Sequence, residues 1–133
     1  MNKLIIDVVG EKIFLMIITS SNIYNITYEN TKINYEKLTK LINDFLISYN
    51  LTISDISTIY VNKGPGSFAG IRNSLSTVKA FNVAKKIDYY CYSLDDFEGE
   101  IDVRYENIPD LCKKYSIKKN LINPVYILSL IHI

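Results

Sequence analysis

A change of hydrophobic period near residue 35 constrains the fold more than any other feature of this 133-residue sequence. Before it, three short runs rich in β-branched residues are separated by turn residues, which is typical of an antiparallel three-stranded meander. The expected strands are 3–9, 13–19 and 23–29. The second run is apolar almost throughout, so we expect both of its faces to be covered.

Beyond residue 35 the apolar residues recur every three or four positions, which is the period of an amphipathic helix. Asn34 is the predicted N-cap, and Glu36 lies in the first turn, where the helix dipole favours an acid. We expect this helix to end near Asn50. The residues of its apolar stripe are Tyr35, Leu38, Leu41, Ile42, Phe45, Leu46 and Tyr49.

Three further elements follow in the order strand, helix, strand. The apolar pattern predicts a strand at 57–62, a helix at 70–86 and a strand at 89–93. Strands that are connected through helices in this way lie parallel, with right-handed crossovers. The sequence therefore predicts an α/β fold in which an antiparallel three-strand meander joins parallel strands in one mixed sheet, with two long helices.

The end of the chain carries a weaker pattern. Six acidic residues lie within 95–106, which indicates a solvated loop or linker. A short helix is expected to begin at Pro109, and a final strand at 125–131. We therefore expect the whole chain to form one domain, with an N-terminal lobe at 1–98 and an acidic linker, short helix and C-terminal strand at 99–133.

Charge and rare residues disfavour several classes of function. The chain has 15 basic and 14 acidic residues and a net charge of +1, which argues against binding nucleic acid through a global positive field. Cys91 and Cys112 have no neighbouring ligand residue and His132 is the only histidine, so a histidine-centred or zinc site is strongly disfavoured. The unpaired thiols and the lack of an apolar run of about 20 residues predict a cytoplasmic protein without membrane contact.

A glycine-rich loop separates the strand at 57–62 from the helix at 70–86. Glycines allow close backbone approach and a helix N-terminus offers free N–H groups, so one interpretation is a phosphate site. The loop lacks the GK[ST] ending of a Walker loop and the GxGxxG spacing of a dinucleotide site. The other interpretation is a tight turn that lets Phe68 plug the sheet edge. The candidate loop residues are Gly64, Pro65, Gly66, Ser67, Phe68 and Gly70.

As a whole string, residues 63–72 (KGPGSFAGIR) closely resemble the GPGSFTGLR signature of the TsaB (YeaZ) family. Residues 4–7 (LIID) resemble the family's first strand with its terminal aspartate, 53–56 (ISDI) the lead-in to the signature, and 123–127 (NPVYI) the closing segment without its arginine. That family is the non-catalytic partner in making threonylcarbamoyladenosine (t6A) on transfer RNA. The match covers residues 1–98, and most of the family's second lobe is missing, so the chain resembles a shortened member.

The resemblance implies the N-terminal lobe of an actin-like ATPase (ASKHA, RNase H-like) fold, in which nucleotide sits between two lobes. A single lobe offers no cleft that could bury it. Val8 and Val9 follow Asp7 where the family places a small hydroxyl residue, and neither can hydrogen-bond a phosphate. Asn34 stands where the family tends to have histidine. We therefore expect no cofactor, no metal and no catalytic residue, with Asp7 a satisfied turn carboxylate.

The helix at 70–86 carries an uncharged row of small residues opposite its apolar side. Phe68, Ile71, Leu75 and Val78 are expected to face the sheet. The row is either a plain exposed side or an interface that lets another helix approach closely. We favour an interface, because interface centres are depleted in charge and the row holds none. The predicted partner-interface residues are Ala69, Arg72, Asn73, Ser76, Thr77, Ala80 and Ala84.

The resemblance also implies the partner. In the TsaB family the first and second long helices contact TsaD, the catalytic paralogue, so the row would meet a TsaD-type enzyme and Arg72 would bind a partner carboxylate or backbone group. A TsaE-type ATPase is a further candidate partner, and contact with transfer RNA is at most indirect. The sequence thus predicts a non-catalytic scaffold that activates a TsaD-type enzyme. Two alternatives remain: a small phosphate- or nucleotide-binding enzyme that uses the loop 64–70, and a self-associating homodimer.

Overall fold

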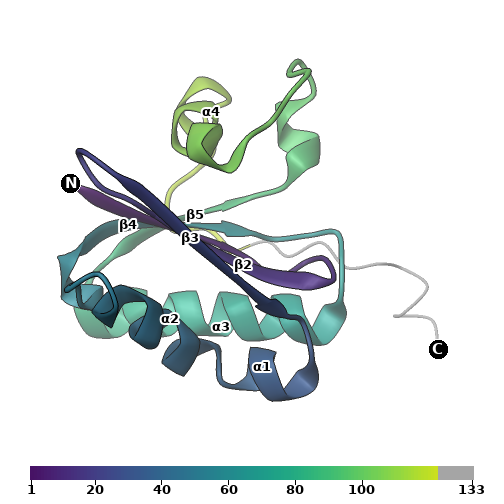
Figure 1. Ribbon diagram of the computed structural model, residues 1–133. Helices are drawn as coiled ribbons and strands as arrows, with labels where there is room; N and C mark the ends of the chain where they lie inside the picture. Colours follow the sequence, from purple (N-terminus) through teal and green to yellow (C-terminus); the bar gives the residue numbers. More distant parts are fainter. Residues whose placement is uncertain (123–133) are drawn as a thin grey trace.

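A five-stranded mixed sheet organises the computed structural model, which describes residues 1–122 (Figure 1). The spatial order is β3-β2-β1-β4-β5, in which β1, β2 and β3 pair antiparallel while β1, β4 and β5 pair parallel. The predicted combination of meander and parallel strands is confirmed, whereas the strand expected at 125–131 lies outside the described residues. The strands are β1 (Asn2–Asp7), β2 (Lys12–Ile18), β3 (Ile23–Glu29), β4 (Ile56–Asn62) and β5 (Asp88–Tyr92).

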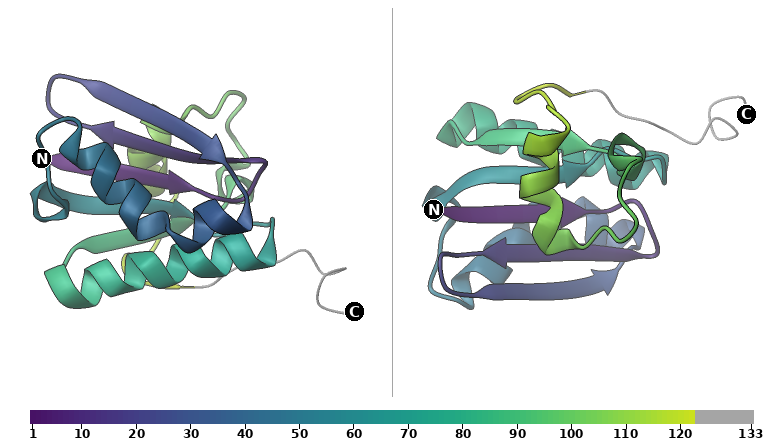
Figure 2. Two further views of the ribbon diagram at one scale, coloured as in Figure 1. Left: turned by 60° about the horizontal axis from the view of Figure 1, so that its bottom comes forward. Right: turned by 90° about the horizontal axis from the view of Figure 1, so that it is seen from above.

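Helices cover both faces of the sheet (Figures 1 and 2). One layer contains α1 (Lys32–Glu36), α2 (Leu38–Ile47) and α3 (Phe68–Lys85), and the other contains α4 (Ile108–Lys114). Alternate residues of β2 enter different cores. Leu15 packs in the core on the α1–α3 side, whereas its neighbour Met16 packs in the core on the α4 side. The expectation that this strand is covered on both faces is confirmed.

The single helix expected from residue 35 to residue 50 is wrong, because the structure has two helices here. Lys37, with φ of −108° and ψ of 29°, interrupts the helical backbone between α1 and α2. Thr31 rather than Asn34 is the N-cap of α1, and its hydroxyl accepts the Asn34 N–H. The side chain of Asn34 instead donates to the carbonyl of Glu29 at 2.8 Å. The apolar stripe still buries Leu38, Leu41, Ile42, Phe45 and Leu46 in the core.

The acidic segment expected to be a solvated loop is partly structured. It contains the 3₁₀ helices η2 (Leu94–Phe97) and η3 (Tyr105–Asn107), which lead into α4. Two of its features oppose a free loop: Asp96 accepts the backbone N–H of Ser93 at 2.8 Å, and the Phe97 ring is buried against Tyr92. The short helix with Pro109 in its first turn is confirmed as α4. Within residues 1–122, no helix is long and apolar enough to cross a membrane.

Candidate functional site

The glycine loop packs closely against the end of β1. A Cβ atom on Gly66 would lie 2.6 Å from the carbonyl oxygen of Val9, and one on Gly70 would lie 3.1 Å from that of Val8. Gly64 has a φ of 108°, which favours glycine, and its N–H donates to Asn62 Oδ1 at 2.9 Å. The glycines at these three motif positions are therefore explained by backbone packing within the domain.

Phe68 is less buried than its predicted place at the sheet implies. Phe68 is 40% exposed, whereas Ile71, Leu75 and Val78 are buried as predicted. The helix begins at Phe68 itself, with Ser67 as its N-cap, and the close approach to β1 is made by Gly70 in the first turn.

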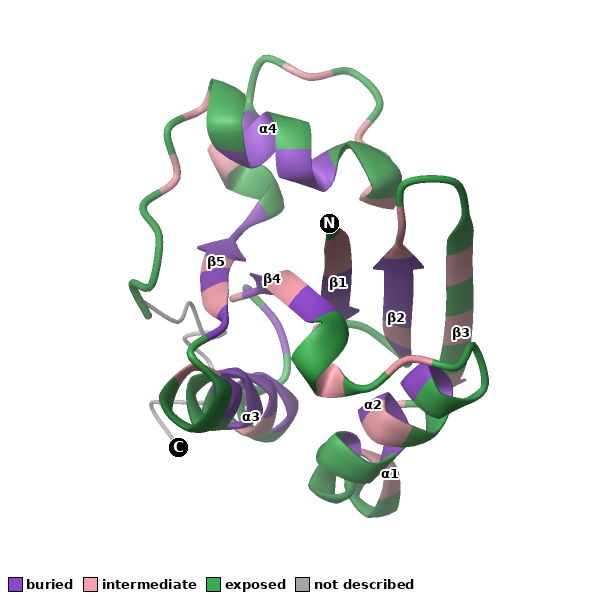
Figure 3. Cartoon of the chain, turned by 90° about the vertical axis from the view of Figure 1, so that its left-hand side faces the viewer, coloured by how far each residue is buried: buried purple, intermediate pink, exposed green. Residues whose placement is uncertain are grey.

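More of the surface of α3 is buried than contact with the sheet alone would bury. Viewed in Figure 3, one side of α3 is buried and the outer side is exposed. α3 contacts α1 and α2 as well as β4 and β5. Ser74 and Thr77 lie on this extended side and are 0% and 8% exposed. The prediction that Thr77 belongs to a partner interface is therefore wrong, because the domain itself buries this residue.

Most of the other predicted interface residues reach the surface on one side of α3. Ala69, Arg72, Ser76, Ala80 and Ala84 are exposed, and Asn73 is half-buried. We call Ala69, Asn73, Ser76, Ala80 and Ala84 the small-residue row. The row is thus available to a partner, while the glycine loop lies at one end of the same helix, roughly 20 Å along the axis from Ala84.

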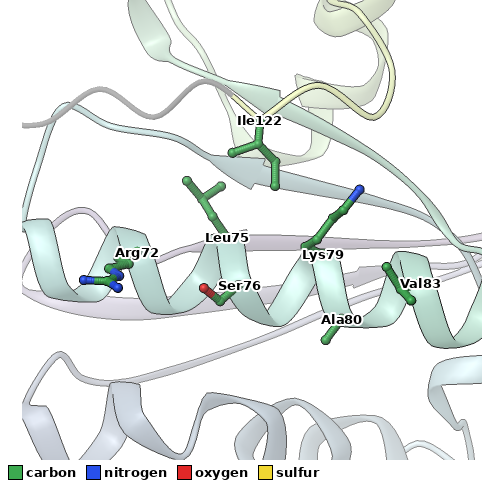
Figure 4. Close-up of a pocket in the computed structure, with 7 residues that line it drawn as sticks. All are labelled: Arg72, Leu75, Ser76, Lys79, Ala80, Val83 and Ile122. Carbon is green, nitrogen blue, oxygen red and sulfur yellow. The ribbon is translucent and has the colours of Figure 1, made fainter.

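A groove of about 560 Å³ runs beside the small-residue row (Figure 4). Two of its side chains were missed by the search for small residues: Val83, which is 70% exposed, and the exposed Lys79. Helical spacing could have found both, because they lie one turn apart on the flank of the row that also carries Arg72. The groove is lined by Arg72, Leu75, Ser76, Lys79, Ala80, Val83 and Ile122.

The carboxylate of Asp7 is buried at the end of β1 and accepts three hydrogen bonds. Its Oδ1 accepts the Val9 N–H at 3.1 Å, and its Oδ2 accepts the Asn62 amide at 3.2 Å and the Tyr105 hydroxyl at 2.9 Å. Asn62 in turn accepts the Gly64 N–H. This network matches the expectation of a satisfied carboxylate, and it ties β1, β4 and the glycine loop to η3.

Tyr105 covers Asp7 from the α4 side of the sheet. Its ring stacks on Phe14 with centroids 3.9 Å apart, and its pKa is raised by burial and then by the Asp7 charge. Tyr92 lies deeper, fully buried, and its pKa is raised by burial and by Asp7 as well. Its hydroxyl has no hydrogen-bond partner among the described residues. Both phenols are therefore held protonated beside this carboxylate.

The residues at this end of the sheet do not fit a metal ion or a nucleotide phosphate. The side chains that touch Asp7 are hydrogen-bond donors, and Val8 beside it is buried. In residues 1–122 no group of three or more His, Cys, Asp and Glu could hold a metal ion. A cavity of about 240 Å³ beside Gly64 and Pro65 is lined by one acidic side chain, Asp95, and by no basic one. An anion there would lie beside the Asp95 carboxylate without a basic side chain in the lining to offset it.

Comparison with known proteins gives one family. The family model described as TsaD, tRNA N6-adenosine threonylcarbamoyltransferase, matches residues 30–99, which is just over half of the chain. No curated protein matches the sequence.

Solved structures share the fold at low sequence identity. YeaZ from Pseudomonas aeruginosa superposes with a TM-score of 0.65 at 18% identity, over 73% of this chain and 46% of that one. A second structure, of an uncharacterized protein with similarity to peptidase YeaZ from the same organism, gives the same values over 45% of its chain. RuvC from T. thermophilus, in complex with a Holliday junction substrate, has a TM-score of 0.51 at 10% identity, over 74% of this chain and 68% of that one. The chain spans less than half the length of the YeaZ chains, and the predicted actin-like (RNase H-like) fold is confirmed.

Proposed function

The chain belongs to the TsaD family of tRNA N6-adenosine threonylcarbamoyltransferase, and from this premise we propose that it is a TsaB-type, non-catalytic subunit of t6A modification. It binds a TsaD-type enzyme as a heterodimer and holds that enzyme in an active state. The observation that carries the proposal is the largely exposed small-residue row on α3, which lies on the outer side of an 18-residue helix packed against α1, α2, β4 and β5.

The shape of the α3 face suits a partner helix. Alanine and serine side chains fill all of the row except Asn73, and they would let a second helix approach near the short end of the 8–10 Å range of interaxial distances. Val83 stands beside the row as an exposed apolar contact, and Arg72 and Lys79 give its flank positive charge. A partner surface that places a small apolar residue on Val83 and a carboxylate near Arg72 would complement this face.

The state of Asp7 supports a scaffold rather than a catalyst. All of its hydrogen-bond partners are internal donors, so an external ligand would have to displace at least Tyr105. That displacement would also break the stack of Tyr105 on Phe14. The alternative of a phosphate-binding enzyme is supported less well, because the loop glycines pack on β1 and the neighbouring cavity carries Asp95.

Mixing experiments test the proposal. The chain and the TsaD-type enzyme of the same organism, each at about 30 μM, are separated by size exclusion with light scattering to give the mass of each species. We expect a 1:1 complex that is absent when either protein runs alone. A mass equal to two copies of this chain, with or without the enzyme, would instead support the homodimer. Failure of a folded sample to associate with the enzyme contradicts the proposal.

A further inference from the structure

A cavity of about 530 Å³ lies between α4 and the sheet, on the face opposite to α3 (Figure 2). Residues of β1, β4 and β5 form its floor, and α4 with the residues just after it forms its wall. It opens near Lys3 at the start of β1, roughly 13 Å along the strand from Asp7. The cavity is therefore separate from the glycine loop and from the network around Asp7.

Two tyrosines line the floor of this α4 cavity. Tyr60 of β4 and Tyr90 of β5 pair in register, and their rings stack with centroids 5.3 Å apart. Tyr60 is only 6% exposed, yet its hydroxyl has no hydrogen-bond partner in residues 1–122. Burial raises the pKa of Tyr60 to about 12, so this hydroxyl stays protonated at neutral pH. A buried donor of this kind is stabilised by an acceptor that enters the cavity.

Two lysines in the lining carry charge that the domain does not neutralise. Lys3 is half-buried on β1 and Lys113 is exposed on α4, and neither forms an ion pair within the part of the chain that the structure describes. The next residue along α4 behaves differently, because Lys114 pairs with Glu100 at 2.8 Å. The two ammonium groups at the cavity are therefore free to bind an oxyanion.

The cavity also contains one carboxylate, that of Asp110 in the first turn of α4. Its charge is outnumbered by those of Lys3 and Lys113, so the lining carries an excess of one positive charge. The cavity beside the glycine loop has the reverse balance, since Asp95 is the charged residue of its lining. Electrostatics therefore favour an anion in the α4 cavity and not in the other one.

We propose that the α4 cavity binds a small organic anion, whose carboxylate or phosphate group contacts Lys3 and Lys113 and accepts the Tyr60 hydroxyl. Its body would pack on Tyr90 and Ile117, which are half-buried in the lining and offer apolar surface. The volume falls in the range of small-molecule sites, about 300–1,000 Å³, so the cavity suits a whole molecule rather than a bare ion. This inference does not depend on the proposed function, because no partner protein takes part in it.

NMR titration of the full chain tests the site with three probes that share one ring: phenylacetate, phenyl phosphate and benzyl alcohol. We expect the anions to shift backbone amide signals around the cavity with a Kd of about 1 mM or below, and the neutral alcohol to bind at least about tenfold more weakly. The anion that binds more tightly identifies the acid group. Absence of binding by both anions at about 10 mM overturns the proposal, as does equally tight binding of the alcohol.

Single substitutions assign the binding to named side chains. Lys3→Met and Lys113→Met each remove a positive charge and should weaken anion binding at least about fivefold, whereas Asp110→Asn should tighten it. Tyr60→Phe removes only the hydroxyl and should weaken binding about threefold or more. Lys118→Met is the matched control, because it makes the same change of charge at an exposed lysine outside the lining, and its Kd should stay within about twofold of the parent's.

The pattern across the variants is as informative as each value. Equal weakening by Lys3→Met and Lys118→Met would mean that net charge alone attracts the probes, which overturns the site. Weaker binding by Asp110→Asn overturns it as well, because an anion gains from the loss of a nearby carboxylate. The amide spectrum of each variant without a probe shows whether the variant is folded. Lys113 is exposed, so Lys113→Met keeps the proposal testable if Lys3→Met fails to fold.

Discussion

The hydroxyl of Tyr105 donates a hydrogen bond of 2.9 Å to Asp7 Oδ2, across 98 residues of sequence. This bond joins the end of β1 to the segment that follows β5. The Tyr105 ring simultaneously stacks on Phe14. The residues after β5 are therefore anchored to the α4 side of the sheet, beside the Asp7 carboxylate. A catalytic carboxylate at this position would have to be open to a substrate.

Replacing Tyr105 with Phe should destabilise the domain. The substitution removes a hydrogen bond to a carboxylate while keeping the ring, so we expect a loss of about 2 kcal/mol in the free energy of unfolding. Urea denaturation followed by circular dichroism gives this value. A variant as stable as the parent would mean that the bond to Asp7 contributes nothing.

Tyr92→Phe is the matched substitution, with the opposite expectation. The Tyr92 hydroxyl is buried and has no hydrogen-bond partner among the described residues. Removing an unsatisfied buried polar group should leave stability unchanged or raise it by about 1 kcal/mol. The same urea experiment measures it. A loss equal to that of Tyr105→Phe would show that the buried hydroxyl has a partner after all.

Gly66→Ala should be strongly unfavourable, because its Cβ would lie 2.6 Å from the Val9 carbonyl oxygen. We expect a loss of about 2 to 3 kcal/mol, the cost of overpacking a tight contact. Gly10→Ala is the control: a Cβ there meets nothing within 4 Å, so the change should stay within about 0.5 kcal/mol. Thermal melting of the two variants side by side measures the difference between their melting temperatures. Equal melting temperatures would contradict the packing explanation of the glycine loop.

Stability should fall in alkaline solution. Burial raises the pKa of Cys91 to about 11 and that of Cys112 to about 12, from an ordinary value of 9.0. Burial likewise raises the pKa of Tyr60 to about 12 from 10.0. These acids ionise more readily in the unfolded chain than in the folded one. Their contribution to the free energy of unfolding is therefore complete below about pH 8.5, and it is lost as the pH rises toward the pKa values of the folded state.

The pH effect is measured as the urea midpoint between pH 7 and pH 11. We expect a plateau followed by a decline above about pH 9. A Cys112→Ala variant should decline less steeply, whatever its absolute stability. A midpoint that rises over the alkaline range would contradict the burial of these groups.

Local patterns predicted much of the fold because they are read within a few residues. The alternation along β2 and the apolar stripe of α2 follow from strand and helix periods. The break at Lys37, the exposure of Phe68 and the burial of Thr77 depend on how the elements pack on one another, which a helical projection does not contain. The contact of Tyr105 with Asp7 joins residues too far apart in sequence for any local pattern to indicate it.

The central claim is that the outer side of α3 binds a TsaD-type enzyme, and calorimetric titration of that enzyme with two arginine variants tests it most directly. Ala80→Arg places a large charged side chain in the small-residue row, and Ser20→Arg places the same side chain in the turn after β2. Both positions are exposed, so both variants should melt like the parent. We predict that Ser20→Arg binds with the parent's Kd and that Ala80→Arg binds at least about 100-fold more weakly, a difference of about 2.7 kcal/mol. Binding of Ala80→Arg with the parent's Kd, or no binding by the parent itself, would contradict the account.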